Sequence, residues 1–145
     1  MHWLNDKLQN MEDLLIRMNE YRGMNAADVA GAEAAAKMTR EAFAETVRDL
    51  VTAIAGREGI SACFACHDGL LMDSAGSSPD FERLAAEGQK LIDQGVSSLK
   101  RLDFGEFQQM VLIGKNEKVA MFWMGEIGIG IVSSKDTVLS EQLRI

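Results

Sequence analysis

Apolar and polar residues alternate along three consecutive segments in the C-terminal third of the chain. Because successive side chains point to opposite faces of a β-strand, this alternation predicts strands at 107–113, 119–124 and 127–132. Gly114 to Glu117 and Gly125-Glu126 are turn sequences, so neighbouring strands should pair antiparallel. The middle strand is apolar on both faces, and we therefore expect other elements to cover both sides of the sheet.

The N-terminal third has the spacing of helices. Apolar residues three and four apart predict a helix over residues 3–22. An alanine-rich run that follows Asn25, a suitable N-cap, predicts a second helix through Lys37. The apolar stripe from Phe43 to Ile54 predicts a third helix, which either starts near Thr39 or continues from the second without a break.

A second hairpin is expected between these helices and the three strands. Ile60 to Cys66 has the composition of a strand, Asp68-Gly69 is a strong hairpin turn, and Leu70 to Ser74 is the return strand. The two strands would extend the sheet to five. A short closing helix is expected after Ser134.

A long helix should connect the two groups of strands. Ser78 suits its N-cap, Pro79 its first position, and the apolar pattern continues to about Lys100. Gly88 and Gly95 lie seven residues apart on one face of it, although each glycine costs a helix about 1 kcal/mol relative to alanine. They indicate either close approach by another backbone or accommodation of the sheet beneath; both interpretations stay open.

Composition narrows the class of protein. At 145 residues with 47% hydrophobic residues, the chain is long enough for one domain with a sizeable core. The net charge of -7 and pI near 4.8 argue against nucleic-acid binding, which relies on clustered lysine and arginine.

No membrane or export segment is expected. The longest nearly apolar run, Val119 to Val132, contains Glu126 and is shorter than the ~20 residues that span a bilayer. The N-terminus lacks the pattern of an export signal, so we expect a cytoplasmic protein whose cysteines are thiols.

The sequence offers no convincing catalytic site. Gly125, Gly128 and Gly130 do not form a dinucleotide-binding motif, and no phosphate-binding P-loop motif occurs. The two histidines, His2 and His67, have no evident nucleophile to activate, so we expect no enzymatic activity.

Cys63-Phe64-Ala65-Cys66-His67 matches the C-x-x-C-H motif of covalent haem attachment. On a strand, however, residues three apart point to opposite faces, so both thiols could not reach one porphyrin. We therefore expect two small strand residues and no haem, zinc or other cofactor.

The order of elements resembles the Roadblock family, the dynein light-chain roadblock type of domain related to longin and profilin-like folds, over residues 39–145. The resemblance rests on the order and spacing of four short stretches: Gly59-Ile60-Ser61-Ala62, His67-Asp68-Gly69, Leu70-Leu71-Met72-Asp73-Ser74 and the hairpin around Gly125. It implies an α+β fold, a five-stranded antiparallel sheet with helices on both faces. Residues 1–38 would be a helical N-terminal extension.

The resemblance also implies a function. Roadblock domains have no catalytic residues, form dimers through the long helix and the first strand of the three, and serve as platforms or regulators for Ras-like small GTPases. We therefore expect a homodimeric adaptor that binds such a GTPase. The expected dimer residues are Gly88, Leu91, Gly95, Leu99, Phe107, Gln109 and Val111.

Two other functions stay open. A five-stranded sheet between helices also describes PAS- and GAF-like sensors of small molecules, although the volume between sheet and helices should be filled by Trp123, Phe122, Met121 and the isoleucines. The chain could also be a self-assembling structural subunit that uses its N-terminal helix as a coiled-coil contact.

Overall fold

The computed structural model describes residues 3–22, 29–77, 80–124 and 126–139. The chain divides into two compact units: Met1–Leu50 with Ile145, and Val51–Arg144.

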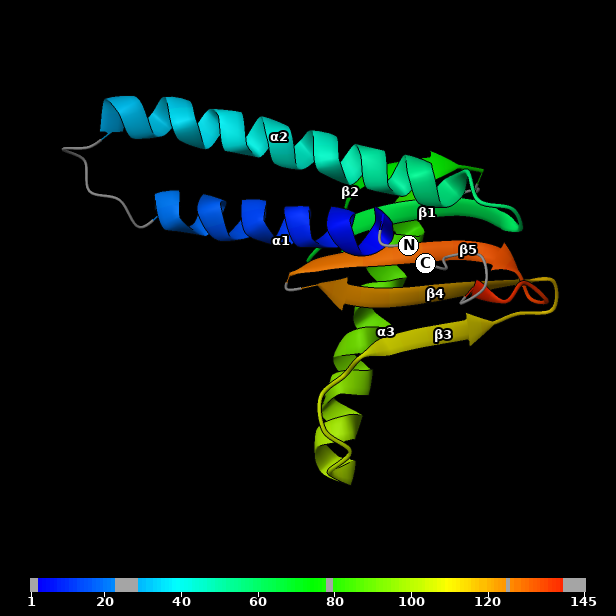
Figure 1. The fold of residues 1–145 in the computed structure, drawn as a ribbon. Helices are drawn as coiled ribbons and strands as arrows, with labels where there is room; N and C mark the ends of the chain where they lie inside the picture. The colour runs from blue at the N-terminus through cyan, green and yellow to red at the C-terminus, as the bar shows by residue number, and fades with distance from the viewer. Residues whose placement is uncertain (1–2, 23–28, 78–79, 125, 140–145) are drawn as a thin grey trace. The chain divides into compact units, whose positions relative to one another are not determined.

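The first unit contains two helices that lie side by side (Figure 1): α1, Trp3–Arg22, and the part of α2, Val29–Ala55, that precedes Val51. Lys7 Nζ of α1 lies 3.6 Å from Asp49 Oδ2 of α2. The apolar stripes are buried at Leu4, Met11, Leu14, Phe43, Val47 and Leu50.

The helix predicted over 3–22 is confirmed, and of the two alternatives for the second and third predicted helices, the continuous helix is the one found. The domain boundary that we predicted between residues 38 and 39 therefore falls inside α2. The N-cap predicted at Asn25 lies outside the described residues.

The second unit is built on a five-stranded antiparallel sheet, which confirms the predicted fold class. The strands are β1 Ile60–His67, β2 Leu70–Gly76, β3 Gln109–Ile113, β4 Glu117–Met124 and β5 Ile127–Ser134, in the order β2-β1-β5-β4-β3. Since β5 includes Ser134, this residue ends a strand instead of starting a helix. Most of the predicted closing helix lies outside the described residues.

The turns explain the antiparallel pairing. Asp68 and Gly69 have φ of 49° and 76°, and two successive positive φ values are typical of the type I′ turn that joins paired strands. Met124 pairs with Ile127, so the β4–β5 connection also has two residues. Both predicted hairpins are confirmed.

The long helix, α3 (Phe81–Leu102), packs on one face of this sheet. Asp80 caps it, because its carboxylate accepts a hydrogen bond from the Arg83 backbone N–H at 3.0 Å. The first helical residue is Phe81, so the predicted start at Pro79 is wrong; Ser78 and Pro79 lie outside the described residues. The core of this layer consists of Ala62, Phe64, Cys66, Ala85, Met121 and Val132.

The opposite face of the sheet is also buried, at Cys63, Ala65, Ile129 and Ile131. Alternation along β1 and β5 places these residues opposite the α3 layer. The expectation that both faces of the sheet are covered is therefore confirmed.

Candidate interaction surface

The two edges of the sheet differ. At the β2 edge the register shifts between Ala65 and Cys66 in the β1–β2 pairing, and Asp73 adds a charge to β2. Bulges and charges hinder the addition of a further strand. β3, in contrast, pairs in unbroken register with β4, from Gln109 opposite Phe122 to Ile113 opposite Lys118, and has no charged residue. β3 is therefore the edge suited to pairing with another chain.

The side chains of β3 are exposed although they are apolar. Val111 is 45% exposed, Leu112 42% and Ile113 69%. These three residues point alternately to the two faces of the sheet, so β3 is poorly covered on both. An apolar edge strand of this kind favours association.

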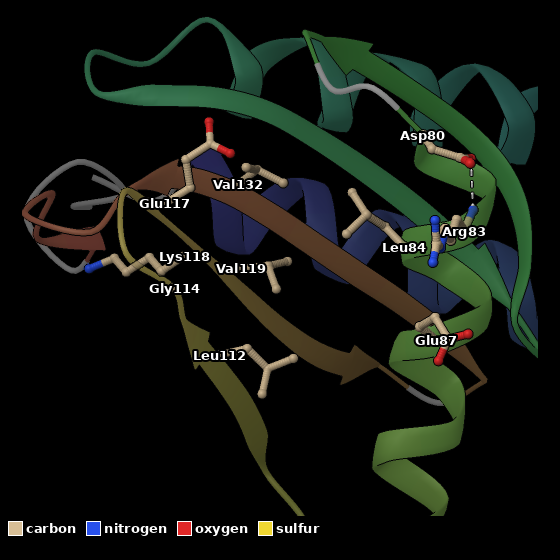
Figure 2. A pocket seen from close by; sticks show the side chains of 10 residues that line it. All are labelled: Asp80, Arg83, Leu84, Glu87, Leu112, Gly114, Glu117, Lys118, Val119 and Val132. Carbon is tan, nitrogen blue, oxygen red and sulfur yellow. Dashed lines mark hydrogen bonds between the residues drawn. The ribbon is translucent and has the colours of Figure 1, made fainter.

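An open groove of about 500 Å³ lies between the first turns of α3 and the β3–β4 hairpin (Figure 2). Its apolar lining consists of Leu84, Leu112, Val119 and Val132, and the side chains of Leu84, Leu112 and Val119 turn toward the same space. Charged residues complete the lining: Asp80, Arg83, Glu87, Glu117 and Lys118. Lys118 Nζ donates a hydrogen bond to the carbonyl oxygen of Thr137.

The groove corrects one expectation. We expected bulky side chains of the strands to fill the volume between sheet and helices. Met121 and Trp123 do pack in the core beneath α3, but the volume beside the β3–β4 hairpin is open.

The two helix glycines face the sheet of their own chain. A Cβ on Gly88 would lie 2.8 Å from Met121 Cε, and a Cβ on Gly95 would lie 3.5 Å from Phe107 Cε2. Phe107 in turn packs edge-to-face on Trp123, with ring centroids 5.8 Å apart. At Gly88 the glycine therefore accommodates the sheet, whereas a Cβ at Gly95 would make only an ordinary contact.

These contacts sort the seven expected dimer residues. Three of them pack against their own chain: Gly88, Gly95 and Phe107. The glycine face of α3 is therefore not bare. Leu91, Gln109 and Val111 are exposed, and Leu99 is half-buried.

Two exposed apolar residues, Leu102 at the end of α3 and Phe104 after it, were not among the residues that the sequence indicated. The half-buried Leu84, the exposed Leu91 and Leu102 are seven and eleven residues apart, and these spacings return to the same side of an α-helix. Leu102 is 58% exposed, and Phe104, in the connection to β3, is 73% exposed. The spacing of the leucines was visible in the sequence, but the sequence did not indicate that Leu102 is exposed.

No family model and no curated protein matches the chain. Among solved structures, it is similar to a Roadblock/LC7 domain from Streptomyces avermitilis, with 17% identity and a TM-score of 0.59 over 66% of this chain and 83% of that chain. MglB of Myxococcus xanthus matches with 17% identity and a TM-score of 0.61, over 67% of this chain and 76% of that one. An MglB structure with a tetrameric arrangement matches with 16% identity and a TM-score of 0.57, over 68% and 75%. The chain has the Roadblock fold.

Within this Roadblock fold, the two cysteines point to opposite faces of β1, as expected. Cys63 and Cys66 are both buried, and both are free thiols. Burial raises the pKa of the Cys63 thiol to about 12. Burial also raises the pKa of Cys66, partly offset by a hydrogen bond from the Gly128 backbone. Two neutral thiols on opposite faces suit neither haem attachment nor metal binding.

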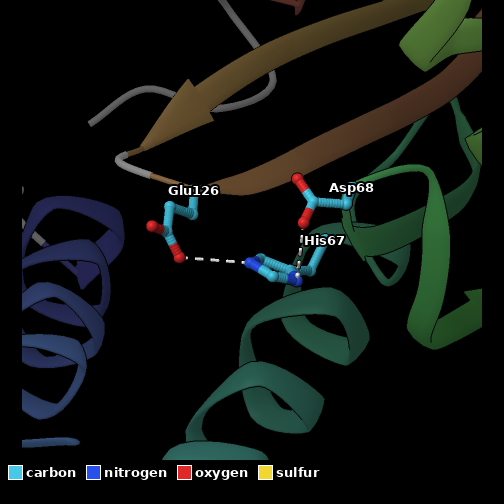
Figure 3. A network of polar contacts seen from close by, with 3 residues as sticks. All are labelled: His67, Asp68 and Glu126. Carbon is cyan, nitrogen blue, oxygen red and sulfur yellow. Dashed lines mark hydrogen bonds and ion pairs between the residues drawn. The ribbon is translucent and has the colours of Figure 1, made fainter. Parts of the chain in front are cut away.

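His67, the last residue of the C-x-x-C-H stretch, is 41% exposed in its side chain and lies between two carboxylates (Figure 3). Its Nε2 is 3.1 Å from Glu126 Oε2, and its Nδ1 is 3.7 Å from Asp68 Oδ2. Within the described ranges, no three His, Cys, Asp or Glu side chains are placed to hold a metal ion. This imidazole therefore connects two hairpin turns.

The candidate site of this chain is consequently an exposed, largely apolar surface. We call it the α3–β3 surface: the β3 edge, the groove, and the exposed residues Leu91, Leu102 and Phe104. None of the described helices is long and apolar enough to span a membrane.

Proposed function

We propose that this chain is a non-enzymatic, cytoplasmic adaptor that forms a homodimer and binds a Ras-like small GTPase, whose nucleotide cycle or position it alters. The observation that carries the proposal is the α3–β3 surface, an unprotected strand edge beside an open apolar groove. The Roadblock fold supports it, because the resemblance of the sequence to that family implies a dimeric platform for GTPases.

The first contact of the proposed dimer is between the two β3 strands. Antiparallel pairing centred on Val111 places Gln109 of each chain opposite Ile113 of the other, so that the two sheets become one. The regular register of β3 and its lack of charge favour this pairing. A twofold axis through the pair uses the same surface on both chains, as closed dimers do.

The groove supplies the second contact. α3 runs across the strands, and its C-terminal turns extend beyond β3 (Figure 1). A twofold axis through β3 would therefore bring this end of the partner's helix over the groove. Leu102 and Phe104 are the apolar residues that the helix end would carry there, and burying such a side chain contributes about 1.5–3 kcal/mol.

This arrangement gives each chain both halves of the contact. The apolar floor of the groove, Leu84, Leu112, Val119 and Val132, would be covered reciprocally. The MglB structure with a tetrameric arrangement is an example of self-association by a protein of similar fold. In this dimer the C-terminal end of α3 in one chain approaches the groove of the other chain. The glycines of the two α3 helices do not face each other.

The GTPase contact rests on different properties. The outer side of α3 is polar, with Asp93, Gln94, Ser97, Ser98 and Arg101 around a shallow hollow. Polar surfaces suit partners that bind and dissociate, whereas permanent interfaces are more apolar. The switch segments of Ras-like GTPases are ordered by the γ-phosphate, so binding should depend on the nucleotide.

The test has two independent parts. Sedimentation velocity of the purified chain at about 1–50 μM measures the dimer, since a working dimer should have Kd at or below micromolar. For the GTPase, the immobilised chain is incubated with lysate of its source organism in the presence of a non-hydrolysable GTP analogue or of GDP. The captured GTPase is then purified, and its affinity and hydrolysis rate are measured with the chain.

Removing the first helix distinguishes this proposal from the structural-subunit alternative. Deletion of residues 1–28 leaves α2 whole, unlike a cut at residue 38. An adaptor should keep its dimer and its nucleotide-dependent partner after the deletion. Loss of all self-association would support the structural subunit.

A second candidate function is a small-molecule sensor, and the groove is the observation that favours it. Its volume of about 500 Å³ is within the range of ligand sites, ~300–1,000 Å³. A thermal-shift screen of metabolites tests this function. A genuine ligand should lose its effect on Leu84→Trp, which fills the groove, but keep it on the control Leu70→Trp at an exposed site of β2.

A further inference from the structure

We draw no further inference here: the strongest candidate, the shallow polar hollow on the outer side of α3 lined by Asp93, Gln94, Ser97, Ser98 and Arg101, carries none because it belongs to the surface already proposed for the GTPase contact.

Discussion

Gly130 of β5 lies directly opposite Phe64 of β1, and the phenyl ring occupies the space that a side chain at position 130 would need. Phe64 is fully buried and also packs edge-to-face on Phe81, the first residue of α3, with ring centroids 6.1 Å apart. The absence of a side chain at Gly130 therefore lets one aromatic ring connect the centre of the sheet to the start of the helix. Gly128 leaves space for Trp123 in the same way, because a Cβ on Gly128 would lie 3.1 Å from the indole ring.

Gly130→Ala should destabilise the protein by about 1–3 kcal/mol, because the added methyl group would overlap the Phe64 ring. The ring is fully buried, so it has no free space into which it could move. Urea unfolding followed by circular dichroism measures the change. Gly56→Ala is the matched control, since its Cβ would lie 3.5 Å from the nearest atom, an ordinary contact. Equal stabilities of the Gly130 variant and the wild type would contradict the packing described here.

The double variant Gly130→Ala, Phe64→Leu separates this contact from a general effect on the strand. If the overlap with the ring is the cause, the alanine should cost less in the Phe64→Leu background than in the wild type. Additive losses would show that the two residues are not coupled.

Leu102→Glu should weaken the proposed homodimer at least about tenfold, which corresponds to about 1.4 kcal/mol, because a charge would have to enter the apolar groove. The monomer should keep its fold, since Leu102 is already 58% exposed. Sedimentation velocity over a concentration series gives the dissociation constant.

Leu70→Glu is the control for this experiment. Leu70 is 72% exposed and lies in β2, at the other edge of the sheet, so the dimer should be unaffected. A wild-type protein that stays monomeric at tens of micromolar would refute the homodimer altogether. A dimer that tolerates Leu102→Glu but is lost in Val111→Lys would retain the strand pairing and refute the groove contact.

Stability should fall above about pH 9, the ordinary pKa of a cysteine thiol, because the folded state holds the Cys63 proton up to a pKa of about 12. Below pH 9 the thiol is protonated in both states, so its contribution is fully present. Between pH 9 and 12 only the unfolded state loses the proton, which lowers the free energy of unfolding by about 1.4 kcal/mol per pH unit for this group.

Urea unfolding at pH 8 and pH 10 measures this effect. The Cys63→Ala variant should lose less of its free energy of unfolding between the two pH values, because it lacks this thiol. The other groups that titrate in this range are the same in both proteins. The same burial predicts that a thiol reagent at pH 8 reacts only slowly with the native protein. After denaturation the reagent should react with both thiols. Rapid reaction of both thiols in the native state would contradict the burial of β1.

Binding of the proposed GTPase should weaken as salt rises from about 50 to 150 mM, because a chain of net charge -7 would be attracted to a basic partner surface. Affinity should also be higher for one nucleotide state than for the other. Titration calorimetry at two salt concentrations, with the GTPase loaded with GDP or a GTP analogue, tests both. Equal affinities for the two nucleotide states would argue for a passive scaffold.

The sequence alone determined which segments form strands, and the reason is local. Alternation over β3, β4 and β5 and the positive-φ preference of Asp68-Gly69 are properties of neighbouring residues, so they could be recognised without knowledge of the rest of the chain. The opposite orientations of Cys63 and Cys66 followed from the same alternation. Continuity of α2 through residues 38 and 39 was left open because no glycine or proline marks a boundary there.

Tertiary structure alone decided which way each surface points. Gly88 and Gly95 have the same sequence context whether they face a partner or their own sheet, and only the positions of Met121 and Phe107 distinguish the two cases. The groove likewise depends on the distance between α3 and the β3–β4 hairpin, elements that are separated along the chain. Which surface a helix residue faces depends on contacts between segments that are distant along the chain. The hydrophobic pattern of the helix alone is the same whether that residue faces its own sheet or a partner.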